Sequence, residues 1–366
     1  MNVVFRVDAS IQMGTGHVMR CLTLAEELRR LGHRCIFICR HHLGHLGELI
    51  ARKGFELHFL VSADYEKSPV TDGIKSLYAD WLVVPWQQDA RQTLELLASL
   101  SADWLVVDHY ALDVRWEREL AAAVGRIMVI DDLANRNHEC TLLLDQNLGR
   151  AGSDYNDLVP KDCLRLIGPK YALLRPEFAE LRERSLKRRE NPELKRILIS
   201  LGGVDRTNVT GQILKALEET RLPKETQIDV IMGATAPYLN EVRQKATELP
   251  FKSKVSVNVS DIGERMCMAD LAIGAAGSTS WERCCLGLPA ILVVLADNQK
   301  MVNQSLIEKG VAVGLDVEIL KEVGGTLLDH VLAQVWPRAR ELTAKAAVVT
   351  DGFGCSRLVG YLMRAE

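Results

Sequence analysis

The chain has 366 residues, of which 48% are hydrophobic and 25% charged, and its formal net charge is −3; this balance is typical of a globular protein and gives no reason to expect nucleic acid or an anionic membrane as a partner. A chain of this length exceeds one ordinary core, so we expect two domains. Nine cysteines without a C-x-x-C spacing, and no apolar run of membrane-spanning length, favour free thiols in a cytoplasmic protein with no membrane insertion.

The first half alternates β-rich runs with amphipathic segments. We expect strands over 3–7, 34–39, 56–61, 104–108 and 127–132, and helices over 18–32 and 89–100. This alternation predicts a parallel, doubly wound α/β sheet. The hexapeptide ADWLVV occurs at both 79–84 and 102–107, which indicates either a short repeat or vocabulary shared by two strands.

The second half begins after the charged stretch RERSLKRRENPELKR at 182–196, where acidic residues interrupt the basic ones. That mixture favours a solvated linker over a nucleic-acid patch. Strands are then expected over 197–203, 228–233, 255–259, 271–277 and 290–295. The predicted organisation is an N-terminal Rossmann-like domain over 1–182, a linker over 183–196, a second Rossmann-like domain over 197–350 and a C-terminal helix over 351–366.

Three glycine loops follow expected strands: MGTGH at 13–17, SLGGVDRTN at 200–208 and GAAGSTSWE at 274–282. Ligands of open α/β sheets bind beyond the carboxyl ends of the strands, and helix starts favour anions. None of the loops is a P-loop, and the first lacks the full G-x-G-x-x-G fingerprint, which argues against a dinucleotide. The two loops of the second domain favour a diphosphate. Glu282 could accept both hydroxyls of a ribose or could simply cap its helix.

His17 lies on the first turn of an expected helix. The helix dipole there disfavours the imidazolium, so a neutral general base is one interpretation, although a nearby diphosphate would act in the opposite direction. A structural histidine that closes the turn is the other. Asp8, after the first strand, could orient the imidazole, bind a sugar or only shape the turn. HHLGH at 41–45 is a weak metal pair, and the Asp131–Asp132 pair could hold a metal, act as acid and base, or cap the next segment.

Several motifs resemble one known family. They are FRVDAS-x-x-MGTGHVMRCLTLA at the start, VVDHY at 106–110, YALLRPEF at 171–178, ISLGGVDRTN at 199–208, GAAGSTSWERCCLGLP at 274–289 and ADNQ at 296–299. The chain resembles the PseG family, the UDP-2,4-diacetamido-2,4,6-trideoxy-β-L-altropyranose hydrolases, and its second half resembles MurG-like glycosyltransferases more widely. The resemblance implies a GT-B fold, in which two doubly wound domains face a central cleft. It also implies hydrolysis of the UDP-sugar in pseudaminic acid biosynthesis, which supplies flagellin glycosylation.

The resemblance also implies residue roles. The family's catalytic histidine falls on His17, its motif tyrosine on Tyr110 and a substrate-contacting arginine on Arg175. Water activated by His17 would attack the anomeric carbon opposite UDP, breaking the C–O bond with inversion and without an obligatory metal. The candidate catalytic residues are His17, Tyr110 and Asp8, and the candidate substrate-binding residues are Gly14, Thr15, Gly16, His109, Arg175, Gly202, Gly203, Met232, Gly277, Ser278, Thr279, Glu282, Asn298 and Gln299.

The sequence leaves alternatives open. A UDP-sugar-dependent glycosyltransferase needs little new chemistry on the same architecture, and a non-catalytic UDP-sugar-binding protein would bind without turnover. A dinucleotide oxidoreductase is disfavoured by the broken fingerprint. We expect a monomer that takes a UDP-sugar and has no cofactor, no metal and no nucleic-acid partner. Trp281 has no assigned role.

Overall fold

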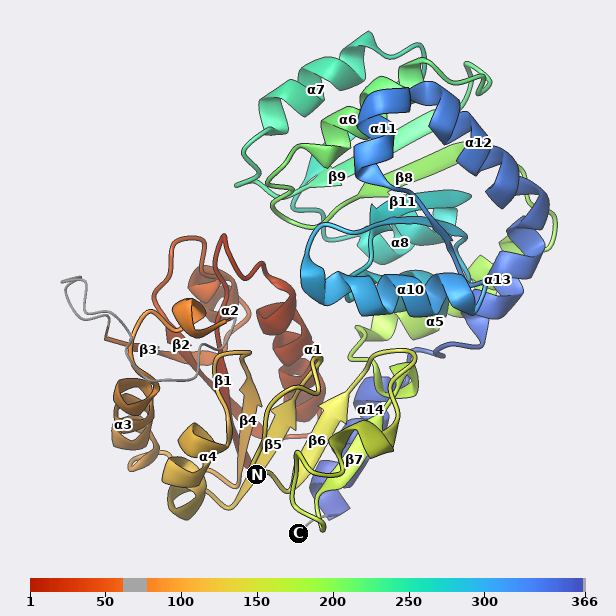
Figure 1. Ribbon diagram of the computed structural model, residues 1–366. Coiled ribbons are helices and arrows are strands. Elements are labelled where there is room, and N and C mark those ends of the chain that lie inside the picture. Colours follow the sequence, from red (N-terminus) through yellow and green to blue (C-terminus); the bar gives the residue numbers. More distant parts are fainter. Residues whose placement is uncertain (62–77, 365–366) are drawn as a thin grey trace. The chain divides into compact units, whose positions relative to one another are not determined.

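The computed structural model describes residues 1–61 and 78–364. The chain forms two compact units, each around its own parallel sheet (Figure 1). The first unit comprises Met1–Leu173 together with Cys355–Glu366, and the second comprises Leu174–Gly354. The chain therefore leaves the first unit, builds the second and returns.

The division lies before the expected linker, because helix α5 (Pro176–Arg188) belongs to the second unit. Arg182 donates hydrogen bonds to the carbonyl oxygens of Cys285 at 2.5 Å and Ala347 at 2.6 Å. Ser185 Oγ donates to the carbonyl oxygen of Leu286 at 2.7 Å. The first part of the charged stretch thus forms the second half of α5, which packs on the second unit. The residues between Arg188 and Arg196 connect α5 to β8.

The first sheet has seven parallel strands in the order β3-β2-β1-β4-β5-β6-β7. Strands β6 and β7 are absent from the sequence-based expectation, because each has four residues and no α-helix lies between them. The strands are β1 (Asn2–Val7), β2 (Arg34–Arg40), β3 (Glu56–Leu60), β4 (Trp104–Asp108), β5 (Arg126–Ile130), β6 (Leu142–Asp145) and β7 (Leu164–Ile167).

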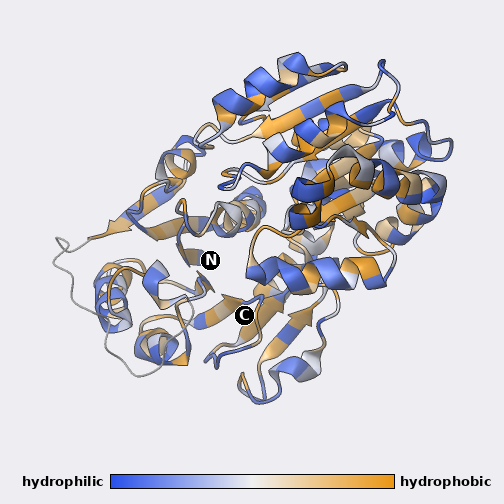
Figure 2. Ribbon diagram, turned by 45° about the horizontal axis from the view of Figure 1, so that its top comes forward, coloured by the Kyte–Doolittle hydropathy of each residue, from blue (hydrophilic) through white to orange (hydrophobic). Residues whose placement is uncertain are grey.

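Both faces of this sheet are covered, as period-two alternation requires. Val3 and Phe5 lie in one core, with α1 and the returning helix α14, whereas Val4 lies in the core on the other face, with α3 and α4. The strands are accordingly rich in hydrophobic residues, and the helices alternate in hydropathy (Figure 2). The helices are α1 (Gly16–Arg30), α2 (Gly47–Arg52), α3 (Trp86–Leu97), α4 (Val114–Leu120) and α14 (Gly354–Arg364).

The second sheet has six parallel strands in the order β10-β9-β8-β11-β12-β13. Its core on one face includes α6, α7 and α12, while α8 and α9 contact the sheet elsewhere and α5 and α13 pack against them. The strands are β8 (Arg196–Ser200), β9 (Gln227–Met232), β10 (Lys252–Val257), β11 (Leu271–Ala275), β12 (Ala290–Val293) and β13 (Val313–Gly314). The helices are α5, α6 (Val209–Glu218), α7 (Leu239–Glu248), α8 (Ile262–Met268), α9 (Thr279–Cys285), α10 (Lys300–Glu308), α11 (Val317–Val323), α12 (Gly325–Val335) and α13 (Ala339–Ala347).

Both strand orders reverse direction once, between β1 and β4 in the first sheet and between β8 and β11 in the second. Ligands of doubly wound sheets bind beyond the carboxyl ends of the strands at such a reversal. The fold thus marks one candidate position in each unit.

Three sequence-based expectations can be checked directly. The second ADWLVV copy lies in and just before β4, but the first forms a 3₁₀ turn at Ala79–Trp81, followed by Val83 with φ 56°. The explanation that both copies are strands of similar composition is therefore wrong. All nine cysteines are free and buried. Within the described ranges, no helix combines the length and the apolar character that crossing a bilayer requires.

Candidate active site

His17 is the second residue of α1 and reaches the end of β4. Its Nδ1 lies 2.7 Å from Asp108 Oδ1. Arg20, one turn further along α1, holds the same carboxylate by donating from Nε and from one terminal nitrogen, both at 2.6 Å. Burial alone would raise the pKa of Asp108, but the charge of Arg20 and the hydrogen bonds from Arg20 and His17 lower it well below its usual range.

This arrangement selects one tautomer of His17. An ionised Asp108 can only accept hydrogen bonds, so the proton of the neutral imidazole lies on Nδ1 and the lone pair on Nε2. A carboxylate that fixes the imidazole in this way also stabilises the imidazolium that forms after proton uptake. His17 thus has the orientation and the partner of a general base.

Tyr110 joins the same network through a second carboxylate. Its hydroxyl donates to Asp132 Oδ2 at 2.8 Å, and Arg20 donates to that oxygen at 2.7 Å. The Tyr110 ring meets the His17 ring edge-on at 4.7 Å between centroids, and Trp81 stacks on Tyr110 at 5.4 Å. The imidazole consequently has both aromatic rings and hydrogen-bonded carboxylates among its neighbours.

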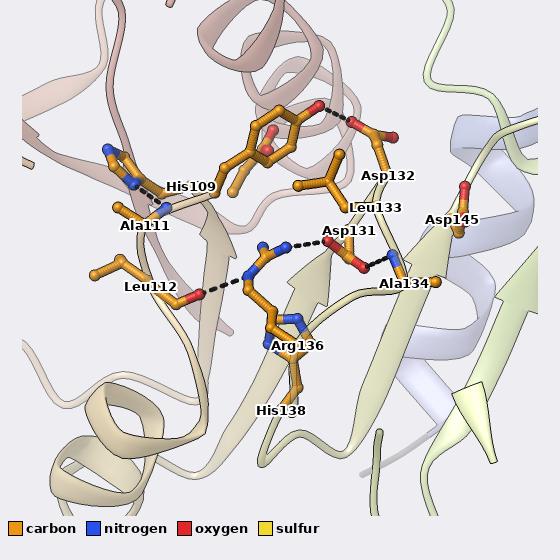
Figure 3. A network of polar contacts seen from close by, with 12 residues as sticks. His109, Ala111, Leu112, Asp131, Asp132, Leu133, Ala134, Arg136, His138 and Asp145 are labelled. Atoms are coloured by element: carbon orange, nitrogen blue, oxygen red, sulfur yellow. Dashed lines mark hydrogen bonds and ion pairs between the residues drawn. The ribbon is translucent and has the colours of Figure 1, made fainter. Parts of the chain in front are cut away.

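The Asp131–Asp132 pair divides between two roles. Asp131 accepts hydrogen bonds from the backbone N–H of Ala134 at 2.8 Å and from Arg136 at 2.6 Å (Figure 3). Asp131 therefore closes its own turn, as the capping interpretation predicted, and only Asp132 reaches the His17 network. An acid–base pair formed by the two neighbours is not what the structure contains.

Asp8 has partners other than His17. Its carboxylate lies 2.7 Å from Arg6 and accepts the backbone N–H of Arg40 at 2.6 Å. The Nε2 atom of His109 is 3.3 Å away from the other carboxylate oxygen. The residue that orients the imidazole is Asp108, which corrects the expectation for Asp8. The signal was present in the sequence, because Asp8 follows Arg6 by two residues at the end of a strand, a spacing that places alternate side chains on the same side.

The side chain of His109 is buried. Its Nδ1 accepts the backbone N–H of Ala111 at 3.1 Å (Figure 3), and its side chain is buried against Asp8. Burial lowers the pKa of His109. The structure therefore gives His109 a buried position beside Asp8, with no exposed nitrogen for a ligand, which corrects its inclusion among the binding candidates.

The first glycine loop, which precedes His17 in the chain, has open space at Gly14. Gly14 has φ +79°, and a Cβ there would meet nothing within 4 Å. The loop is held by the N–H of Gly14 donating to the carbonyl oxygen of Ser10 at 2.8 Å. Thr15 is the N-cap of α1 without a side-chain capping bond, and Gly16 begins the helix. Backbone of this kind can approach a ligand closely.

The loop after β8 is less suited to an anion at its helix start than the sequence suggested. Asp205 accepts the N–H groups of Val209 at 3.0 Å and Thr210 at 2.8 Å, so these donors of α6 are already satisfied. Gly202, with φ +94°, and the adjacent Gly203 precede this cap, and a Cβ on Gly202 would meet nothing within 4 Å. Any ligand contact here would come from these glycines.

Met232 is a core residue. It ends β9 and is 3% exposed, packed within the main hydrophobic core of the second unit. Its side chain is therefore unavailable to a ligand, which corrects its inclusion among the binding candidates. Hydrophobic residues at strand ends are ambiguous in sequence because the last inward position and the first loop position look alike.

The loop after β11 gathers most of the remaining candidates. Ser278, the N-cap of α9, makes no side-chain capping bond and Thr279 begins the helix. Glu282 lies 3.9 Å from Arg175, which also pairs with Glu177 at 3.1 Å. Burial raises the pKa of Glu282 to about 7. This carboxyl is consequently poised between its two protonation states near neutral pH.

The residues around the loop after β11 include a polar neighbour, an exposed residue and a core residue. A Cβ on Gly277 would lie 3.9 Å from Gln299 Nε2, while Gln299 Oε1 accepts the backbone N–H of Leu295 at 2.9 Å. Asn298 is exposed on the following turn. Trp281, 2% exposed, is a core residue. The loop therefore brings together Gly277, Ser278, Thr279, Glu282 and Gln299, with Arg175 beside them.

Comparison with known proteins supports this picture. Residues 198–350 match the glycosyltransferase family 28 C-terminal domain. A UDP-2,4-diacetamido-2,4,6-trideoxy-beta-L-altropyranose hydrolase of Campylobacter jejuni is 27% identical over 85% of this chain and 97% of its own length. The chain is a homologue of that hydrolase. This confirms the resemblance inferred from the motifs.

Two further comparisons complete the assignment. An uncharacterised protein of Methanocaldococcus jannaschii is 25% identical over 84% of this chain, and the chain spans 59% of that relative's length. The crystal structure of Acinetobacter baumannii MurG aligns with a TM-score of 0.68 at 13% identity and covers 99% of both chains. The chain thus has the GT-B fold, with two Rossmann-like domains.

In the part of the chain that the structure describes, no group of three or more histidine, cysteine, aspartate or glutamate side chains is placed to hold a metal ion. His41 and His45 of the HHLGH stretch have ring centroids 4.3 Å apart, and His45 Nδ1 accepts the N–H of Gly47 at 3.0 Å. This pair contributes to its own turn.

Proposed function

We propose that this protein hydrolyses a UDP-sugar by attack of water on the anomeric carbon, with His17 as the general base. The observation that carries the proposal is the 2.7 Å contact between His17 Nδ1 and Asp108 Oδ1 at the start of a helix beyond the carboxyl end of a parallel sheet. It leaves Nε2 as the basic nitrogen. A neutral imidazole with a fixed tautomer is what removal of a proton from water requires.

In this mechanism Nε2 of His17 takes one proton as the water oxygen bonds to the anomeric carbon. The bond between that carbon and the diphosphate oxygen breaks, and its electron pair leaves with UDP. Attack opposite the leaving group inverts the anomeric centre. Asp108 stabilises the imidazolium, and Arg20, which binds both oxygens of Asp108 at 2.6 Å, keeps that carboxylate ionised and fixed.

The second unit is the proposed binding site for UDP. Gly277 and Ser278 would offer backbone and hydroxyl donors to the diphosphate, and Glu282 would accept the two ribose hydroxyls in its ionised form. Arg175, 3.9 Å from Glu282, would hold that carboxylate or contact the sugar. The match to a glycosyltransferase family 28 C-terminal domain supports this assignment.

The sugar we propose is the diacetamido-trideoxy-altropyranose named for the Campylobacter jejuni relative, which aligns over 97% of its length. The reaction would then belong to pseudaminic acid biosynthesis, which supplies flagellin glycosylation. The protein would act in the cytoplasm as a monomer. A UDP-sugar-dependent glycosyltransferase is the second candidate. The family 28 match and the likeness to MurG favour it specifically.

The deciding experiment is to incubate the protein with this UDP-sugar in water enriched in heavy oxygen, with EDTA and without an acceptor, and to follow both products by mass spectrometry. Unlabelled UDP and labelled sugar are the expected result, because water attacks carbon. Label in UDP would mean P–O cleavage and would remove His17 from the role of base. Binding of UDP without release from the UDP-sugar would favour a transferase or a non-catalytic binding protein.

The base assignment has its own test. His17→Asn removes the basic nitrogen and keeps a side chain that can donate to Asp108. We expect turnover to fall by about 10²–10⁴-fold, the range typical of general base catalysis, with UDP affinity unchanged in calorimetry because the variant leaves the second unit untouched. A folded variant that turns over at the wild-type rate would contradict the assignment.

A further inference from the structure

Arg283 lies buried where the ends of β8 and β11 meet. It is 2% exposed, and one terminal nitrogen donates to the carbonyl oxygen of Ala275 at 2.6 Å and to Ser280 Oγ at 3.0 Å. The other terminal nitrogen lies directly against Gly274, where any Cβ would overlap it. That same Cβ position is 3.0 Å from the carbonyl oxygen of Ser200. The guanidinium is therefore at the strand-order reversal of the second sheet.

Two of its nitrogen atoms have no partner. Nε and the terminal nitrogen beside Gly274 are buried donors that have no hydrogen-bond acceptor within reach. Among the described residues, no carboxylate forms an ion pair with Arg283, whereas three buried arginines of the first unit pair with aspartates: Arg6 with Asp8 and Asp89, Arg20 with Asp108 and Asp132, and Arg40 with Asp89. Arg189 of the second unit is also buried without an ion pair, but it donates to four carbonyl oxygens. An unpaired buried charge is costly.

The charge nevertheless persists at neutral pH. Burial lowers the pKa of Arg283 to about 10, which still leaves the guanidinium protonated at pH 7. Arg283 binds the carbonyl oxygen of Ala275, the last residue of β11. The loop that follows contains Gly277, where a Cβ would have no neighbour nearer than 3.9 Å, and Ser278, which makes no side-chain capping bond. A buried cation without a counter-ion, close to open backbone at a ligand-binding position of the fold, is an arrangement that a bound anion would complete.

We propose that Arg283 is the buried counter-charge for the diphosphate of a nucleotide bound on the β11–α9 loop, and that it determines the preference of this unit for a nucleoside diphosphate over a nucleoside. The inference rests on the proposed function in taking UDP as the ligand. Arg283 acts from beside the loop, so it is a positioning and specificity residue. The competing role is purely structural: holding the loop through Ala275 and Ser280.

Calorimetry with UDP and with uridine separates the two roles. In Arg283→Met, which keeps the volume and removes the charge, we expect UDP affinity to fall roughly ten- to a hundredfold, since low-dielectric electrostatics are strong, while uridine affinity stays within about twofold. Arg283→Lys should restore most of the UDP affinity because it retains the charge. A structural role would weaken UDP and uridine equally in the methionine variant, which would overturn the proposal.

The chain offers a matched control in Arg189, a buried arginine of the same unit that donates to carbonyl oxygens of Ser185, Met266, Cys267 and Ala269. Arg189→Met should leave the ratio of UDP to uridine affinity unchanged. If Arg283→Met does not fold, Arg283→Gln keeps a donor for Ala275 and gives the same comparison.

The outcomes for the two proposals are distinguishable. A wild-type protein that shows no preference for UDP over uridine would contradict both the proposed function and the role of Arg283. A wild-type protein that prefers UDP, together with an Arg283→Met variant that retains this preference, would overturn the role of Arg283 alone.

Discussion

Asp108 binds two side chains of helix α1 at once. His17 and Arg20 both bind its carboxylate, and Arg20 also reaches Asp132 at 2.7 Å. A histidine–aspartate pair alone would leave the carboxylate free to rotate. The arginine fixes the plane of the carboxylate, so the imidazole inherits its orientation from two elements, α1 and β4, rather than from one.

Replacing this carboxylate tests the network. Asp108→Asn offers an amide in place of one oxygen, so the asparagine can donate to Nδ1 and shift the imidazole proton to Nε2, where it blocks base catalysis. We expect kcat to fall about 10³–10⁴-fold, by analogy with the same change in serine protease triads. Steady-state kinetics check it. The control is Asp113→Asn, which changes the N-cap of α4 and should leave kcat near the wild-type value.

Glu282 predicts a pH dependence of binding. Its pKa is raised to about 7 by burial, so the carboxyl is mostly protonated below that pH and mostly ionised above it. Only the ionised form accepts both ribose hydroxyls. Uridine affinity should therefore rise as pH increases from about 6 to 8, and calorimetry should show a flat, weaker profile for Glu282→Gln. Affinity that falls over this range in the wild type would contradict the ribose assignment.

Helix α14 packs on the first sheet, although the strands of that sheet lie far from it in the sequence. Leu358, Val359 and Leu362 are at most 2% exposed and share a core with Val3 and Phe5. The covering of one face of the first sheet is thus divided between helices from both ends of the described chain (Figure 1). Loss of α14 would expose that apolar face.

The contribution of α14 is measurable with one substitution. Leu358→Ala removes a fully buried side chain and should lower the free energy of unfolding by about 2–5 kcal/mol. Met363→Ala, on the same helix but 42% exposed, should change it by less than about 0.5 kcal/mol. Urea unfolding followed by circular dichroism gives both values. Equal effects of the two substitutions would show that α14 does not pack as described.

The elements show what the sequence could and could not predict. Long amphipathic runs such as α1 and the buried strand β4 were predictable because their periodicity is strong. Strands β6 and β7 could not be predicted because runs of four residues show too little periodicity. The hexapeptide ADWLVV forms a 3₁₀ turn in one place and part of a strand in the other, because the surrounding structure and not the local sequence determines its conformation. His17 was identifiable from its position, whereas its pairing with Asp108 depends on β1 lying beside β4, which only the strand order reveals.

At the scale of the whole molecule, each unit has its own core and its own assigned task. The first holds the His17 network and the second the loop assigned to UDP. A ligand that binds the folded form of one unit stabilises that unit directly, by about 2.7 kcal/mol at a ligand concentration one hundred times Kd.

Hydrogen exchange can locate this effect. With saturating UDP, we expect slower amide exchange mainly in β8, β11 and the loop that precedes α9, since stabilisation follows the binding site. The sheet of the first unit, including β1 and β4, should change little. Protection centred on the first unit would place UDP elsewhere and contradict the assignment. Uridine should reproduce the pattern more weakly.

The return of the chain to the first unit also has a consequence for synthesis on the ribosome. The strands of that unit emerge first, but α14 follows only after Leu174–Gly354, about 180 residues later. At about 5–20 residues per second this delay is on the order of ten to forty seconds. During that time the apolar surface that Leu358 and Leu362 later cover is exposed on the nascent chain. We therefore expect chaperones that bind exposed hydrophobic segments to bind this chain during its synthesis.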